Sequence, residues 1–249
     1  MEKINLGVKA ALFPSPVVMC GTYNEDHSVD VMTIAWAGMA ASNLVEINIL
    51  ENHKTTDNIK KRKAFTLAVA TKELMVPCDY LGVVSGAKVA DKFEKSGLTA
   101  VKSEFVDAPV INELPLTMEC ELVSMDKGPE ELRIVGKIKN VVAHKAILGE
   151  DGKVDVSRIH AIVWDNFKAG YYEVGEKVGQ SFRESKKLDS FLAEHKSGLS
   201  QLAGWADEKK EETPSAACGT ACGAADAEPE KKEETPSAAC GTVCGAADK

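Results

Sequence analysis

The chain has 249 residues, and its 30 Lys and Arg against 38 Asp and Glu leave a net charge of −8. A mildly acidic chain without a Lys/Arg-rich stripe is not expected to bind nucleic acid. No segment is apolar over the length that a membrane span needs, and the first residues are not expected to form a signal peptide. We therefore expect a cytoplasmic protein with no membrane partner, whose seven Cys do not form structural disulfides.

The sequence of the first half of the chain predicts strands with three helices between them. Apolar alternation and β-branched residues predict the strands, and polar runs predict the turns. A polar stretch with Thr55 or Thr56 as N-cap predicts a helix. We expect strands at 16–23, 29–35, 46–50 and 65–70, and helices at 55–63, 74–84 and 89–95.

Two longer strands follow, at 116–126 and 132–144, and the turn signal Lys127-Gly128-Pro129 lies between them. We predict that they form an antiparallel hairpin, with Met118, Cys120, Leu122 and Ser124 on one face of the first strand. Many strands, short turns and no regular βαβ alternation favour a barrel over a doubly wound sheet. The predicted class is mainly β with some α.

The composition changes near Trp205. Residues 207–249 carry five Lys and ten acidic residues, so the rest of the chain holds only −3 of the net −8. The segment KKEETPSAACGTACGAAD at 209–226 returns at 231–248 with one substitution. Because it has almost no large apolar residues, it cannot offset its ordering entropy by burial. We predict a body at 1–205 and a flexible tail at 206–249 with two CGTxCG repeats.

Several well-known motifs are absent from the sequence. It has no G-x-G-x-x-G after a strand, no P-loop, no G-x-S-x-G and no H-E-x-x-H. The five His are scattered, so no His-rich metal site is predicted. A Rossmann dinucleotide site and the hydrolase chemistry of those motifs are therefore not expected.

Four segments in order resemble the flavin reductase-like family, including its flavoredoxin branch. They are VDVMTIAWAG at 29–38, ENHKTTDNI at 51–59, DYLGVVSGAKVADKF at 79–93 and KAGYYEVGEKVGQSF at 168–182. The resemblance covers roughly residues 12–182. It implies an FMN-binding split β-barrel of Greek-key type with flanking helices, a homodimer, and one FMN per subunit near the dimer interface.

The first segment would lie along the flavin. The backbone of Met32, Thr33, Ile34 and Ala35 would offer N–H and C=O groups to the polar edge of the ring, and Trp36 would add an aromatic surface. The alternative is an ordinary core strand in which Trp36 only packs.

The second segment would hold the phosphate. His53, Lys54 and Thr55 come just before or at a helix start, where free N–H groups attract anions. FMN carries about two negative charges there. The family often has Arg in this region, so Lys54 would serve with one ammonium group in place of a bidentate fork. The alternative is a solvated helix cap.

The third segment would border the flavin with Ser85, Gly86, Lys92 and Phe93. Ser85 can donate to a flavin or phosphate oxygen, and Lys92 near the ring would stabilise the anionic reduced flavin. A surface lysine on an amphipathic helix is the competing interpretation of Lys92. Cys20, Cys78 and Cys120 are interpreted as packed thiols.

The resemblance implies one of two functions. The first is an FMN-dependent oxidoreductase that passes electrons from NAD(P)H to an acceptor, with no obligatory catalytic side chain because the flavin carries the chemistry. The second is a flavoredoxin-like carrier that exchanges electrons with protein partners. Cys218, Cys222, Cys240 and Cys244 of the tail are possible redox thiols. A Cys₄ metal site and a tail without a role remain as alternatives, and C-x₃-C is not the usual metal knuckle.

Overall fold

The computed structural model describes residues 3–196 and 198–199. Residues 10–177 form one compact unit. Residues 3–9 and 178–199, of which 197 is not described, belong to a second unit. The predicted boundary at residue 205 and the tail lie outside the described residues.

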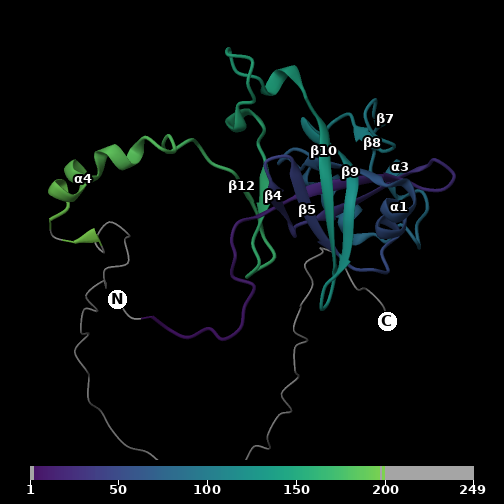
Figure 1. Ribbon diagram of the computed structural model, residues 1–249, viewed down its shortest axis with the longest axis horizontal. Helices are drawn as coiled ribbons and strands as arrows, with labels where there is room; N and C mark the ends of the chain where they lie inside the picture. The colour runs from purple at the N-terminus through teal and green to yellow at the C-terminus, as the bar shows by residue number, and fades with distance from the viewer. Residues whose placement is uncertain (1–2, 197, 200–249) are drawn as a thin grey trace, which may run out of the picture. The chain divides into compact units, whose positions relative to one another are not determined.

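The compact unit is built on a seven-stranded antiparallel sheet with the order β3-β2-β6-β9-β10-β5-β4. Its strands are β2 (Val18–Tyr23), β3 (Val29–Ile34), β4 (Ala37–Ala41), β5 (Leu44–Ile49), β6 (Ala64–Val69), β9 (Leu116–Lys127) and β10 (Leu132–Ala143). Figure 1 shows the long β9–β10 hairpin rising beside the shorter strands. The predicted hairpin is confirmed.

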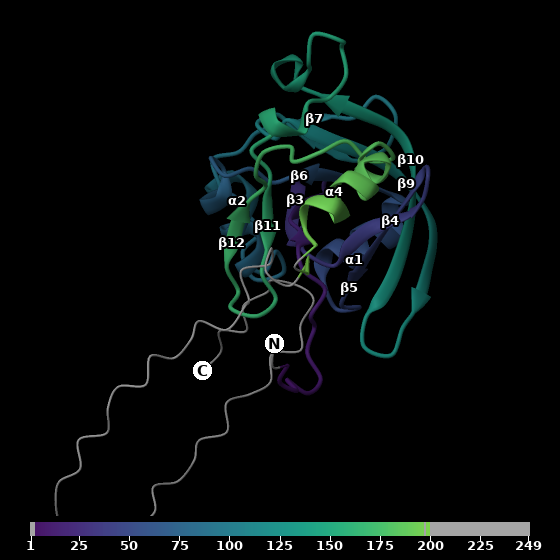
Figure 2. The ribbon, with the colours of Figure 1, turned by 90° about the vertical axis from the view of Figure 1, so that its left-hand side faces the viewer.

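Smaller elements surround this sheet. A three-stranded sheet has the order β1-β11-β12, and β7 pairs with β8; Figure 2 shows β11 and β12 running side by side. Their bounds are β1 (Ser15–Pro16), β7 (Ala100–Lys102), β8 (Pro109–Ile111), β11 (Ile162–Trp164) and β12 (Tyr171–Glu173). The helices are α1 (Lys54–Arg62), α2 (Met75–Val83) and α3 (Lys92–Lys95), with 3₁₀ turns η1 (Lys145–Ile147) and η2 (Val156–Arg158).

The second unit contains η3 (Glu184–Lys187) and α4 (Leu188–Glu194). No helix among the residues that the structure describes is long and apolar enough to cross a membrane.

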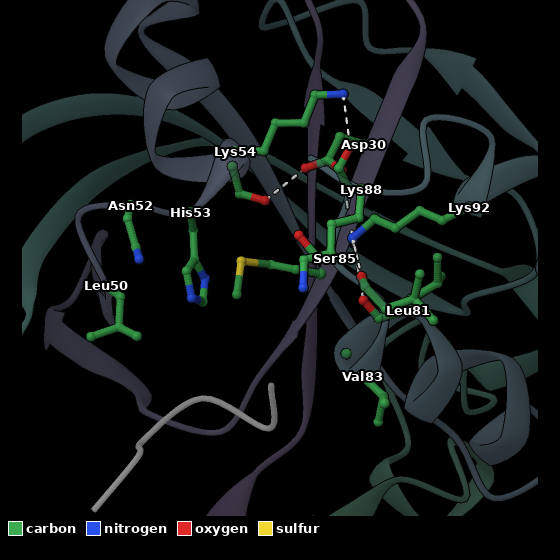
Figure 3. A pocket seen from close by; sticks show the side chains of 15 residues that line it. Asp30, Leu50, Asn52, His53, Lys54, Leu81, Val83, Ser85, Lys88 and Lys92 are labelled. Atoms are coloured by element: carbon green, nitrogen blue, oxygen red, sulfur yellow. Dashed lines mark hydrogen bonds and ion pairs between the residues drawn. The ribbon is translucent and has the colours of Figure 1, made fainter. Parts of the chain in front are cut away.

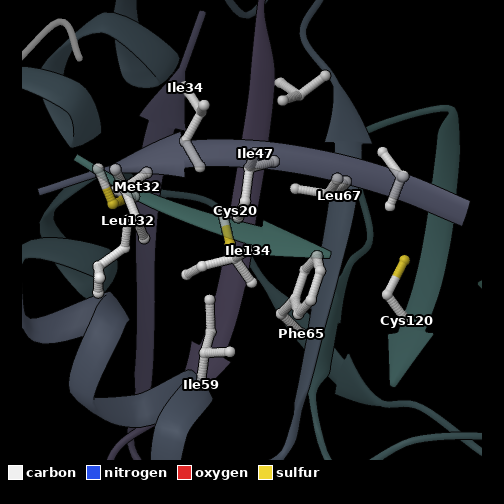
Figure 4. Packing of buried hydrophobic residues seen from close by; sticks show 13 residues of the cluster. Cys20, Met32, Ile34, Ile47, Ile59, Phe65, Leu67, Cys120, Leu132 and Ile134 are labelled. Atoms are coloured by element: carbon white, nitrogen blue, oxygen red, sulfur yellow. The ribbon is translucent and has the colours of Figure 1, made fainter. Parts of the chain in front are cut away.

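Side chains of alternate residues fill two cores on opposite faces of the main sheet. The first core draws from β3, near one edge of the sheet, and from β5 and β10, near the other. Since side chains from both ends of the strand order meet in one cluster, the sheet curls around it without closing (Figure 4). Its members include Cys20, Met32, Ile34, Ile47, Ile59, Phe65, Leu67, Cys120, Leu132 and Ile134.

The second core lies on the other face and packs α2 and α3 against the sheet. Val17 and Met19 belong to it, whereas Val18 and Cys20 belong to the first core, as the two-residue period of a strand requires. Phe93 of α3 and Cys78 of α2 are also members. The helix that carries Cys78 is thus held directly over β3.

Some sequence expectations need correction. The predicted helix 89–95 is shortened to α3, and β4, β7, β8, β11 and β12 were not predicted. Ser124 does not continue the predicted apolar face of β9. The register with β10 shifts between Val135 and Gly136, and this bulge turns Met125 toward the first core in place of Ser124.

Candidate functional site

A cavity of about 250 Å³ opens between β3, the start of α1 and the segment that follows α2. Figure 3 shows side chains from these three segments converging on it. Its lining includes Asp30, Met32, Leu50, Asn52, His53, Lys54, Thr55, Leu81, Val83, Ser85, Gly86, Lys88 and Lys92. Segments more than 50 residues apart in sequence therefore form one site.

The α1 wall supplies a helix start and a cation. The helix begins at Lys54 after the N-cap His53, not after Thr55 or Thr56 as predicted, and His53 makes no side-chain cap hydrogen bond. The N–H groups of Thr56 and Asp57 donate to the His53 carbonyl. The N–H groups of Lys54 and Thr55 come before these bonds, at the positive end of the helix dipole. The Lys54 ammonium donates to the carbonyl of Gly86 at 3.3 Å.

His53 is half-buried in the cavity wall. Its burial lowers the pKa of the imidazole below its ordinary value, and the positive charge of Lys92 lowers it further, against an opposing effect of Asp30. His53 is therefore neutral at neutral pH. With His53 neutral, the charged lining residues are Asp30, Lys54, Lys88 and Lys92, so the lining carries three cationic side chains and one carboxylate.

Asp30 lies at the back of the cavity and is buried. Its carboxylate accepts a hydrogen bond from Thr55 Oγ1 at 2.7 Å and forms an ion pair with Lys92 Nζ at 3.5 Å. Lys92 is also buried, so it is not the surface lysine of the competing interpretation. A charged residue inside an otherwise apolar strand was the available sequence signal for Asp30, which the prediction missed.

The structure brings seven of the twelve predicted cofactor residues to the cavity: Met32, His53, Lys54, Thr55, Ser85, Gly86 and Lys92. The other five do not line it. Thr33, Ile34 and Ala35 are buried beside it. Phe93 packs in the second core, and Trp36 is half-buried with an indole N–H that has no partner among the described residues.

Strand geometry explains this division of β3. Asp30 and Met32 line the cavity. Thr33, the next residue along the strand, points to the opposite face. There its hydroxyl donates to the carbonyl of Cys78 at 2.5 Å. A run of neighbouring residues cannot all face one ligand with their side chains. Sequence reasoning also missed Asn52 and Lys88, which lie on the segments that it had singled out, and Leu50, which comes directly before one of them.

The three thiols of the described part of the chain lie outside the cavity. Cys20, Cys78 and Cys120 are free and buried, as predicted. Burial raises the pKa of Cys78 and of Cys120 to about 12 and raises that of Cys20 well above its ordinary value. These thiols stay protonated at neutral pH and cannot act as nucleophiles.

Comparison with known proteins gives two family matches. Residues 10–159 match the flavin reductase like domain, and residues 195–249 match the ACGX-repeat peptide. The tail contains ACGT at 217–220, ACGA at 221–224 and ACGT at 239–242, followed by VCGA at 243–246.

Solved structures are similar over most of the chain. Flavoredoxin of Desulfovibrio vulgaris is 30% identical with a TM-score of 0.71, over 74% of this chain and all of that one. Flavoredoxin from Methanosarcina acetivorans is 24% identical with a TM-score of 0.69, over 76% and 100%. An uncharacterized protein of Archaeoglobus fulgidus is 33% identical over 55% of this chain and 79% of that protein.

The two flavoredoxin structures have the fold of the curled, open sheet described above, which is the split barrel that the resemblance predicted. The family model covers more than half of the chain. The chain belongs to the flavin reductase-like domain family.

Proposed function

We propose that the protein is an FMN-containing oxidoreductase that passes electrons from NAD(P)H to an acceptor. The observation that carries the proposal is the charge of the cavity. Its lining carries three cationic side chains and one carboxylate, and the phosphate of FMN carries about two negative charges. The family membership of the chain supports the same cofactor.

The α1 wall would hold the phosphate. Lys54 lines the cavity and uses its ammonium on a single carbonyl acceptor, that of Gly86, so two of its three N–H donors remain for the anion. The N–H groups at the start of α1 add further donors. Met32 and Ser85 would contact the rest of the cofactor.

A homodimer would complete the site. At about 250 Å³ the cavity is smaller than the roughly 300–1,000 Å³ typical of small-molecule pockets. One subunit would therefore enclose only part of FMN, and a second copy of the chain would cover the remainder.

The flavin ring would supply the redox chemistry when bound, so the chain needs no catalytic acid or base. The chain's own residues would anchor the phosphate and exclude water from the back of the cavity, where Leu81 and Met32 are buried. A second candidate is an electron carrier that receives electrons from a protein, favoured by the similarity to flavoredoxin.

One experiment separates these outcomes. The purified protein is expected to be yellow, or to become so with added FMN, and to release FMN on denaturation. Anaerobic mixing with NADH or NADPH should then bleach the flavin rapidly and with turnover. Bleaching only by a reduced protein donor supports the carrier, and a colourless protein that does not take up FMN contradicts both.

We further propose that the four tail thiols, Cys218, Cys222, Cys240 and Cys244, exchange electrons with the flavin or carry them to a partner. Each C-G-T-x-C places two thiols four residues apart in a Gly-containing setting, a spacing that permits a small disulfide. The oxidised disulfide would take two electrons and two protons to give two thiols. Thiol titration after NAD(P)H reduction should show new thiols in the FMN-loaded protein only. Stoichiometric zinc or iron in anaerobically purified protein would support a metal site instead.

A further inference from the structure

Asp30 and Lys92 form a buried ion pair behind the cavity. Their side chains retain only 3% and 4% of their exposure. Figure 3 shows Lys92 extending along the cavity wall to Asp30. A buried charge that loses its partner is costly, so each of the two side chains stabilises the burial of the other.

The hydrogen bonds of Lys92 leave it little to offer a ligand. An ammonium group has three N–H donors and no acceptor. Lys92 Nζ lies 3.3 Å from the carbonyl oxygen of Leu81, 3.3 Å from that of Val84 and 3.5 Å from the carboxylate of Asp30. Three acceptors therefore face the three donors. Two of them are carbonyls at the C-terminal end of α2, where a cation is favourable.

Asp30 in turn holds two other walls of the cavity. It accepts a hydrogen bond from the hydroxyl of Thr55, and this bond connects the first turn of α1 to β3. Its Oδ1 also lies against Gly86, where an added Cβ would stand 2.3 Å from it. Asp30 is thus the point at which β3, the start of α1 and the 84–86 segment meet.

The electrostatics follow from this pairing. The charges of Asp30 and Lys92 cancel each other, so this pair adds no net charge to the lining, whereas Lys54 is a cation on the α1 wall. Without Lys92, the carboxylate of Asp30 would stand unpaired in a site that has to receive a dianion.

We infer that Lys92 is a positioning residue that acts on FMN through Asp30, by neutralising this carboxylate and holding the α2 terminus, and not by contacting the cofactor. The inference rests on the proposed function. This inference differs from direct binding of FMN by Lys92 in one expected result. Removal of the charges of both Asp30 and Lys92 leaves the net charge of the cavity lining unchanged, so the preference for FMN should be kept.

The test is a double-mutant comparison of FMN and riboflavin affinities, measured by flavin fluorescence titration at one pH for all variants. Lys92→Met should weaken FMN about tenfold more than riboflavin, since the unpaired Asp30 repels the phosphate. Asp30→Asn combined with Lys92→Met should restore the preference for FMN to near the wild-type value. Lys60→Met, which removes an exposed charge on α1 outside the cavity, should leave the preference unchanged.

If Lys92→Met lowers the preference for FMN and the double variant does not restore it, Lys92 contacts the cofactor and the inference is wrong. An unchanged preference in Lys92→Met would also contradict the inference. If Lys92→Met does not fold, the double variant alone decides, because it leaves no charge unpaired. The pair Asp30→Asn and Lys92→Gln repeats the comparison with polar side chains. Failure of the wild-type protein to bind FMN would instead contradict the proposed function, which separates the two failures.

Discussion

The carboxylate of Asp30 lies directly against the backbone of Gly86, at a distance that leaves no space for a side chain. A Cβ at Gly86 would stand 2.3 Å from Asp30 Oδ1 and 3.2 Å from Lys92 Cε. Neither neighbour can move away freely, since Asp30 is bound to Thr55 and paired with Lys92. The glycine is required at this position by close approach.

Gly86→Ala should therefore destabilise the protein by roughly 1–3 kcal/mol, the usual cost of overpacking, and should weaken FMN binding. Chemical denaturation and FMN titration would measure the two effects. Gly38→Ala is the matched control, because nothing lies within 4 Å of a Cβ there, and it should change stability by less than about 0.5 kcal/mol. Equal effects at both glycines would argue against the contact with Asp30.

Lys54→Ala should weaken FMN more than riboflavin, because only FMN carries the phosphate that Lys54 is proposed to bind. Loss of one charge-assisted contact costs roughly 1.5–3 kcal/mol, or about a ten- to hundredfold change in Kd. Lys60→Ala, on the exposed side of the same helix, should leave both affinities unchanged. Equal losses for FMN and riboflavin after Lys54→Ala would show that Lys54 acts on folding or elsewhere.

The stability of the protein should fall on acidification through His53. Burial and Lys92 lower its folded-state pKa, so the unfolded chain takes up the proton first as the pH falls. The contribution is complete above the unfolded pKa of about 6.5 and is lost as the pH falls through the lower folded value.

His53→Gln should accordingly reduce the loss of unfolding free energy between about pH 7.5 and pH 5, measured by urea denaturation. His144→Gln, at an exposed position, serves as the control. An acid limb that is the same in wild type and His53→Gln would show that the cavity does not oppose protonation of His53.

The body should assemble without the tail. A chain truncated after Trp205 is expected to form a homodimer that binds FMN as the full chain does, since every residue that lines the cavity falls between 30 and 92. Light scattering would measure the mass and fluorescence titration the affinity. A monomer after truncation would show that the tail takes part in assembly.

Local sequence patterns predicted the elements whose formation depends on residues close together in the sequence. The alternation at 116–126 and 132–144 and the turn at Lys127-Gly128-Pro129 predicted the β9–β10 hairpin, which is confirmed. The small strand β4 was missed because its sequence AGMAA has neither β-branched residues nor alternation. It pairs with β5, and that pairing is what orders it.

The family segments predicted several of the residues that line the cavity, but they did not predict the contacts between those residues. The segments at 51–59 and 79–93 pointed to Lys54, Ser85 and Lys92, which do line one cavity. The pairing of Lys92 with Asp30 depends on how α3 packs on β3, a tertiary contact between residues 62 positions apart in sequence. No local pattern in either segment specifies such a contact.

The burial of Cys20, Cys78 and Cys120 also limits where a thiol reagent can react with the native protein. An alkylating reagent at neutral pH meets protonated, inaccessible thiols in the described part of the molecule. The four remaining Cys are those of the tail. Any thiol label that the native protein takes up at neutral pH is therefore expected on the tail, and denaturation before labelling should reveal the other three Cys.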